Sequence, residues 1–61
     1  MCLSNIYRES DNELLMENTS RIDTVDGLLV IRNLFGETVT VDGVITAVDF
    51  EKNTVVIRCA E

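Results

Sequence analysis

Apolar and polar side chains alternate over short stretches along most of this chain, and a period of two is typical of β-strands. In residues 3–9, Leu3 and Tyr7 fall on one face of such a strand while Ile6 falls on the other. β-branched residues are concentrated in the second half of the chain, and the last alternating stretch is residues 54–59. We therefore predict a β protein rather than a helical one.

A second short apolar segment, residues 13–17, leaves the choice between helix and strand less obvious. Ser10 and Glu13 have the spacing of a helix capping box, which favours a helix starting near residue 11. However, the segment is interrupted by residues 18–20, and a run of about five helix formers is too short to be stable without support. We reject the helix and expect the segment to end at this interruption.

Two Asp-Gly pairs give the strongest local signals. Asp26-Gly27 and Asp42-Gly43 each separate two runs of apolar and β-branched residues. Both central residues of a type I′ turn need positive φ, which glycine accepts freely and aspartate tolerates. We predict a tight hairpin at each pair. Two further connections are expected at residues 36–37 and 51–53.

The predicted elements amount to about six short antiparallel strands in one domain that spans residues 1–61. A flat sheet this small would leave two open edges and a half-covered core, and curling into a small SH3-like or OB-like barrel removes both problems. We expect Met16, Tyr7, Phe35 and Phe50 to contribute to the core. The predicted fold class is therefore all-β, as a small SH3-like barrel.

The run of residues 27–31 is apolar on both alternate faces, which is more than one face of a tiny sheet can bury. Burial in a 61-residue chain offsets the entropy of ordering only narrowly. A symmetric contact with a second copy is the commonest way to cover such a surplus. We therefore expect a homodimer.

The charge balance limits the partners. Eleven Asp and Glu residues against five Lys and Arg give a formal net charge of −6, and the cations are spread along the chain. This field repels phosphate backbones and concentrates cations, so nucleic acid is an unfavourable partner. The sequence also lacks the apolar runs of a membrane span or a signal peptide, and we expect a cytoplasmic location.

Catalysis is not expected. The chain has no histidine, no glycine-rich phosphate loop, and no nucleophile with an identifiable base. Asp49 and Glu51 have the character of turn carboxylates on a solvated face, and nothing marks them as an acid and base pair. A barrel of this size also leaves little concavity for a substrate. We predict that the protein is not an enzyme.

The second residue carries the most distinctive chemistry. Removal of Met1 would make Cys2 the N-terminus, with an α-amine and a thiolate that together form a five-membered chelate ring around a thiophilic metal. Cys59 lies near the other end, and the two cysteines would approach each other if the first and last strands paired. In a reducing cytoplasm we interpret both as free sulfurs, with Cys59 an inert or partly exposed thiol.

Four blocks of sequence resemble one known family in their order and spacing. Residues 1–3, 13–17, 34–37 and 48–50, followed by a closing Val-Val-Ile at residues 55–57, are similar to the CooT family of small nickel-binding proteins. The resemblance covers essentially the whole chain. Cys59 lies outside the family pattern, and Asn18 stands where an acidic residue is usual.

This resemblance implies a homodimeric SH3-like protein that binds nickel(II) through Cys2, with the metal between two subunits. It also implies a role in nickel delivery to carbon monoxide dehydrogenase or its maturation factors. Nickel(II) with thiolate and nitrogen ligands favours four donors in one plane, and two copies of Cys2 supply four. The alternative is a small SH3-like interaction module that binds RNA or a protein and uses its cysteine only structurally.

Overall fold

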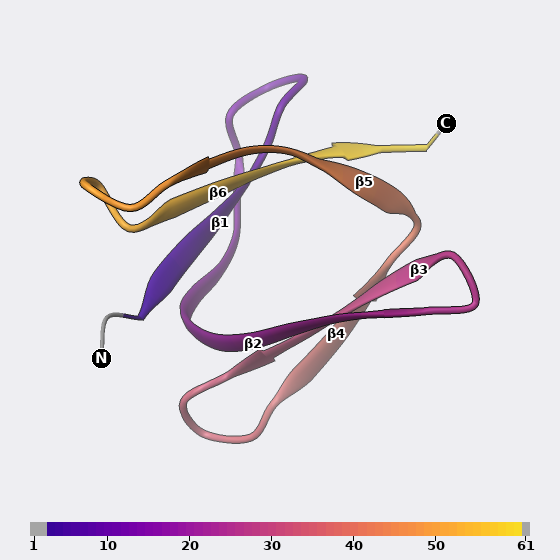
Figure 1. The fold of residues 1–61 in the computed structure, drawn as a ribbon, viewed down its shortest axis with the longest axis horizontal. Helices are drawn as coiled ribbons and strands as arrows, with labels where there is room; N and C mark the ends of the chain where they lie inside the picture. The colour runs from indigo at the N-terminus through magenta and orange to yellow at the C-terminus, as the bar shows by residue number, and fades with distance from the viewer. Residues whose placement is uncertain (1–2, 61) are drawn as a thin grey trace.

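The computed structural model describes residues 3–60, which form one six-stranded sheet and no helix (Figure 1). The prediction of an all-β fold with about six strands is confirmed. Within the described residues, no helix is long and apolar enough to cross a membrane. The strands are β1 (Ser4–Arg8), β2 (Leu14–Val25), β3 (Leu28–Asn33), β4 (Thr38–Val41), β5 (Gly43–Asp49) and β6 (Thr54–Cys59).

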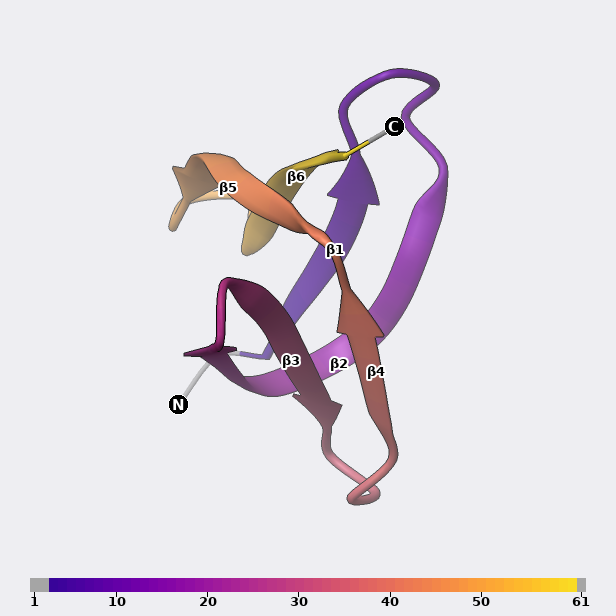
Figure 2. The same cartoon turned by 90° about the vertical axis from the view of Figure 1, so that its right-hand side faces the viewer.

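The strand order is β4-β3-β2-β1-β6-β5, so the two edge strands are consecutive in the sequence. Only Asp42 separates β4 from β5. Because one residue joins the two edges, the sheet curls until its edges meet, and Figure 2 shows β4 running directly into β5. β3 and β5 come into contact without pairing. The sheet is therefore barrel-like but not closed.

The predicted hairpin at Asp26-Gly27 is confirmed, because this pair joins β2 to β3 with φ values of 51° and 78°. The hairpin predicted at Asp42-Gly43 is wrong, since β4 and β5 do not pair with each other. Asp42 is instead the corner at which the chain passes from one sheet edge to the other.

Glycine at position 43 has a different role from the one that its Asp-Gly context suggests. Gly43 pairs with Cys59 of β6, and a Cβ added at Gly43 would lie 2.4 Å from the carbonyl oxygen of Arg58. The backbone amide of Ala60 donates a hydrogen bond to the Asp42 carbonyl oxygen at 2.7 Å. The absence of a side chain thus allows β5 to approach β6 closely at the corner.

The sheet contains one parallel pair, which the expectation of antiparallel strands missed. β1 pairs with β6 in parallel, from Asn5 opposite Thr54 to Arg8 opposite Ile57. Parallel strands need a long crossover connection. Here the crossover consists of β2 to β5, and a sequence pattern that shows only neighbouring hairpins does not reveal it.

β2 continues through residues 18–20, so the predicted interruption there is wrong. Asn18 has a φ of 53° and lies where the register of β2 against β1 shifts, which marks a bulge. Thr19 pairs with Ser4 on one side and with Asn33 on the other. The bulge lets one bent strand join the part of the sheet that holds β1 to the part that holds β3.

The core is small, and it does not include the two phenylalanines. Phe35 is 76% exposed and Phe50 is 87% exposed, because both lie in turns beyond the ends of strands. The prediction that they belong to the core is wrong, whereas that for Met16 is confirmed. The buried apolar residues are Ile6, Met16, Leu29, Ile31, Val55 and Ile57.

The apolar run at residues 28–31 is covered rather than exposed. Leu29 and Ile31 are buried, and the two residues between and before them are half-buried, since β3 lies between β2 and β4. The surplus apolar surface that the sequence attributes to this run lies elsewhere, on β5 and in the turns.

Substituting the corner glycine tests its packing role. We expect Gly43→Ala to destabilise the fold by about 2 kcal/mol, because the new methyl group forces the backbone of β6 to move. It should also speed hydrogen exchange at the Ala60 amide. Gly27→Ala is the comparison, because its Cβ meets nothing within 4 Å and only its positive φ is strained. Unchanged exchange at Ala60 in Gly43→Ala would contradict this role.

Candidate functional site

Cys2, the predicted metal ligand, lies outside the described residues, and backbone and side-chain hydrogen bonds hold the segment that starts β1. The amide of Asn5 donates to the carbonyl oxygen of Asn53 at 2.9 Å. The Asn5 side-chain oxygen accepts from the amide of Asn18 at 3.3 Å, and the Asn18 carbonyl accepts from the amide of Leu34 at 2.8 Å. These bonds connect the start of β1 to the turns that follow β3 and β5.

We call this region the leading end: the start of β1, the β3–β4 turn (residues 34–37) and the β5–β6 turn (residues 50–53). Figure 1 shows all three at the same end of the longest axis. The leading end exposes Leu34, Phe35 and Phe50, at 57%, 76% and 87% respectively. Large apolar side chains exposed together are typical of an interaction surface.

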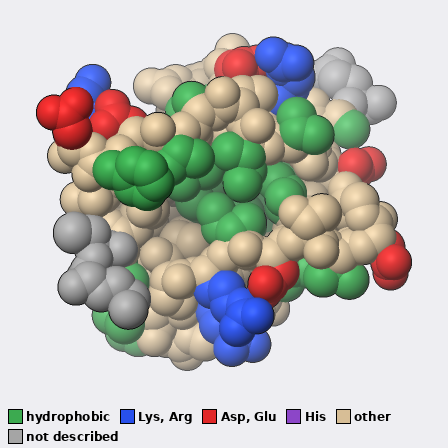
Figure 3. Space-filling view, viewed as in Figure 1, with side chains coloured by type: hydrophobic (Ala, Val, Ile, Leu, Met, Phe, Trp, Pro, Cys, Tyr) green, Lys and Arg blue, Asp and Glu red, His purple; other side chains and the backbone are tan. Residues whose placement is uncertain are grey.

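The second exposed apolar surface follows β5, an edge strand of the sheet. Val44, Ile45 and Val48 are 56%, 42% and 49% exposed, and the strand leads into the turn that carries Phe50. We call these four residues the β5 strip. Figure 3 shows apolar side chains gathered on the face that carries β5. An unpaired edge with apolar side chains favours association with another chain.

Cys59 lies at the other end of the molecule from the leading end. The first and last strands do pair, but because they are parallel the start of β1 lies beside Thr54. Cys59 is five positions further along β6 than Thr54, a distance of about 16 Å. Cys59 is half-buried and free, as predicted for its thiol.

The carboxylates of the described residues are dispersed, and several have structural roles. Asp49 accepts hydrogen bonds from the amides of Glu51 and Lys52 at 2.9 and 3.0 Å, which confirms that it is a turn residue. Among residues 3–60, no group of three or more His, Cys, Asp or Glu side chains is placed to hold a metal ion.

Three of the five cations are paired with carboxylates. Arg8 makes a bidentate contact with Asp11, at 3.0 and 2.8 Å, and reaches Glu13 at 2.8 Å. The hydrogen bonds from Arg8 lower the pKa of Asp11 from its ordinary value of 3.8 to about 2. The other pairs are Arg21 with Asp23 at 2.8 Å and Arg58 with Glu9 at 2.9 Å. Little of the positive charge is therefore left to attract phosphate.

Comparison with protein families identifies the family to which this chain belongs. Residues 1–58 match the model of the family described as CO dehydrogenase accessory protein CooT. The chain belongs to the CooT family. The match to CooT includes Cys2 and stops before Cys59.

One solved structure resembles the whole chain. It is a crystal structure assigned to CooT from Carboxydothermus hydrogenoformans, with a TM-score of 0.90 at 14% sequence identity. The likeness covers 98% of this chain and 100% of the other, and at this identity it shows the shared CooT fold. None of the curated proteins compared with this chain is a match.

The sequence pattern did not reveal the leading end or the β5 strip as exposed apolar surfaces. The signal for the β5 strip is visible, because residues 44–48 are almost entirely apolar or β-branched. Its exposure depends on β5 being an edge strand, which only the topology determines. Phe35 and Phe50 could have been suspected from the turn residues beside them, since a turn holds its side chains away from the sheet.

The Arg8–Asp11 pair gives a prediction for pH dependence. Because the pKa of Asp11 is lowered in the folded state, its contribution to stability is present above pH 3.8 and is lost as pH falls towards 2. We expect Arg8→Gln to raise the pKa of Asp11 and to reduce this loss of stability in acid, as measured by NMR titration and thermal unfolding. In the control, Arg21→Gln, the pKa of Asp11 should not change. If the pKa of Asp11 rose equally in both variants, Arg8 would not be the cause of its lowered value.

Proposed function

We propose that this CooT-family protein binds nickel(II) through Cys2 in a homodimer and delivers the metal during maturation of CO dehydrogenase. The observation that carries the proposal is the match to the CO dehydrogenase accessory family over residues 1–58, which includes Cys2. In this proposal the protein is a non-enzymatic carrier, and nickel is its cargo.

The chemistry of Cys2 supports the choice of metal. After Met1 is removed, its thiolate and α-amine are two donors within one residue, and both lose a proton when they bind a metal. Nickel(II) favours coordination by four thiolate and nitrogen donors that lie in one plane. Two chains related by a two-fold axis supply these four donors. Nickel binding therefore strengthens the dimer, and acid weakens both.

The leading end and the β5 strip support the homodimer. The described core contains six buried apolar side chains, while nine large apolar residues are exposed. Phe50 belongs to both surfaces, because it directly follows β5 and lies in the β5–β6 turn, whose Asn53 accepts a hydrogen bond from Asn5 at the start of β1. A symmetric contact over this region covers the apolar surface and leaves the chain starts of two subunits near the axis.

The metal ligand is tested by titrating nickel into three proteins whose first residue has been verified by intact mass spectrometry. We expect the parent protein and Cys59→Ser to show the same thiolate-to-nickel charge-transfer absorbance, and Cys2→Ser to show none. Affinity should fall as pH drops below about 7, because the thiol and amine are then protonated. If Cys2→Ser binds nickel as the parent does, the carrier function has no chemical basis.

The dimer is tested by placing a charge on the exposed leading end. Phe50→Glu should weaken nickel-linked dimerisation by about tenfold or more, because a large apolar contact is lost and a charge is introduced. Val25→Glu is the matched control, since Val25 is 51% exposed in the hairpin at the other end of the longest axis. Sedimentation of each variant with and without nickel measures the effect. Equal weakening by both charges would show that the leading end is not the contact.

A further inference from the structure

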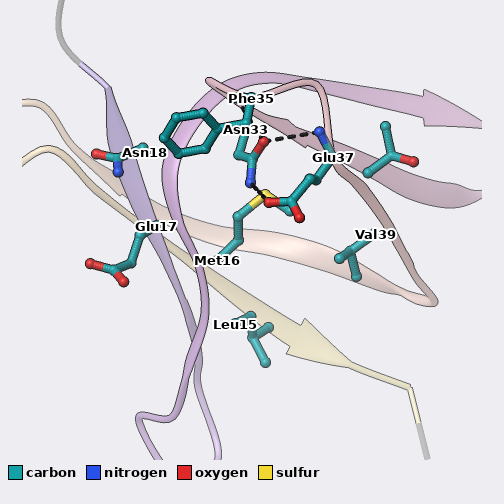
Figure 4. Close-up of a pocket in the computed structure, with 9 residues that line it drawn as sticks. Leu15, Met16, Glu17, Asn18, Asn33, Phe35, Glu37 and Val39 are labelled. Carbon is teal, nitrogen blue, oxygen red and sulfur yellow. Dashed lines mark hydrogen bonds between the residues drawn. The ribbon is translucent and has the colours of Figure 1, made fainter.

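A concavity of about 440 Å³ lies between β2 and the β3–β4 turn (Figure 4). Leu15 and Met16 of β2 line it together with Phe35 of the turn, and the carboxylate residues Glu17 and Glu37 also contribute to its wall. In Figure 4, Glu17 extends on one side of the Met16 side chain and Glu37 on the other. The nickel proposal gives this concavity no part in holding the metal.

Asn33 fixes the Glu37 side of the concavity. Its side-chain amide donates to Glu37 Oε1 at 2.7 Å, while its oxygen accepts from the amides of Phe35 and Glu37, both at 3.0 Å. One oxygen of the Glu37 carboxylate is therefore hydrogen-bonded within the turn before any ligand arrives. Glu37 Oε2 has no hydrogen-bond donor among the described residues and remains available.

The negative charge of this site is not neutralised within residues 3–60. Neither Glu17 nor Glu37 has a cation within salt-bridge distance, whereas Arg8, Arg21 and Arg58 are all engaged with other carboxylates. The net charge of −6 adds to the negative potential. A ligand that carries positive charge is therefore favoured.

The apolar side chains of the wall favour an organic cation that also has an apolar portion. Phe35 is 76% exposed, and an aromatic face attracts a guanidinium or ammonium group, while Leu15 and Met16 offer contact to a methylene chain. An arginine or lysine side chain combines both properties. A hydrated divalent ion prefers oxygen ligands and gains nothing from contact with aromatic and aliphatic side chains. A neutral apolar group would leave the carboxylates without a partner.

We infer that this concavity binds an arginine or lysine side chain presented by a segment of a partner protein. Asn18, which also lines the concavity, donates its amide hydrogen bond to Asn5 of β1. The concavity therefore belongs to the leading end. A basic segment bound here is held next to the start of β1, and its binding needs no metal.

The test uses metal-free protein and two capped synthetic peptides. One carries two arginines between leucines, and its twin carries citrulline, the neutral analogue, in place of arginine. Amide NMR titration should show saturable shifts at Met16, Phe35 and Val39 with the arginine peptide only, and the affinity should fall as salt is added. Equal binding of the citrulline peptide, or no binding of either, would overturn the inference.

Variants separate this site from the general negative field. The double variant Glu17→Gln/Glu37→Gln should bind the arginine peptide about tenfold more weakly, and Phe35→Leu should also weaken it, because it removes the aromatic face. Glu51→Gln, an exposed carboxylate in another turn, is the control and should change affinity less than about twofold. If Glu51→Gln and Glu37→Gln weakened binding of the arginine peptide equally, the concavity would not be the binding site.

Failure of this inference and failure of the nickel proposal are distinguishable. Cys2→Ser should bind the arginine peptide as the parent does, since none of the described residues that line the concavity is proposed to hold the metal. A protein that binds nickel but not the peptide refutes only the basic-segment site. A protein that binds the peptide but not nickel refutes only the carrier function.

Discussion

The parallel pairing of β1 with β6 is the contact on which the whole sheet depends. It joins β2, β3 and β4 on one side to β5 on the other, and within residues 3–60 no other strand pairing connects these two parts. Ile6 and Ile57, which lie on the paired strands, are both fully buried. The same pairing determines that the start of β1 and Cys59 lie at opposite ends of the molecule.

A fold held in this way leaves much apolar surface uncovered. The single-residue corner at Asp42 forces the two sheet edges together, yet β3 and β5 only touch, so β4 and β5 remain as edges. Small domains bury a low fraction of their surface. The exposed side chains at the leading end and along β5 are therefore suited to contacts with other chains. The proposed nickel dimer and the proposed basic segment would both use the leading end, the dimer through Phe50 and the β5 strip and the basic segment through Phe35 and the concavity beside it.

The sequence alone predicted those features that depend on neighbouring residues. The hairpin at Asp26-Gly27 follows from the φ values that these two residues accept, and the strand alternation identified an all-β fold. The unusual chemistry of Cys2 is also a local property, because amine and thiol belong to one residue. The family resemblance relied on the order of such local blocks, and the match over residues 1–58 confirms it.

Long-range pairing decided the rest. The Asp42-Gly43 pair has the same local signal as Asp26-Gly27, but β5 gains a partner in β6 and its glycine serves a close approach to Arg58. Local sequence does not show which strands become edges, and so it did not reveal that β5 and the turn phenylalanines are exposed. The sequence determined most of the strands, the hairpin at Asp26-Gly27 and the connections at residues 36–37 and 51–53. Only the tertiary structure decided which surfaces surround the start of β1, because non-local strand pairing sets burial.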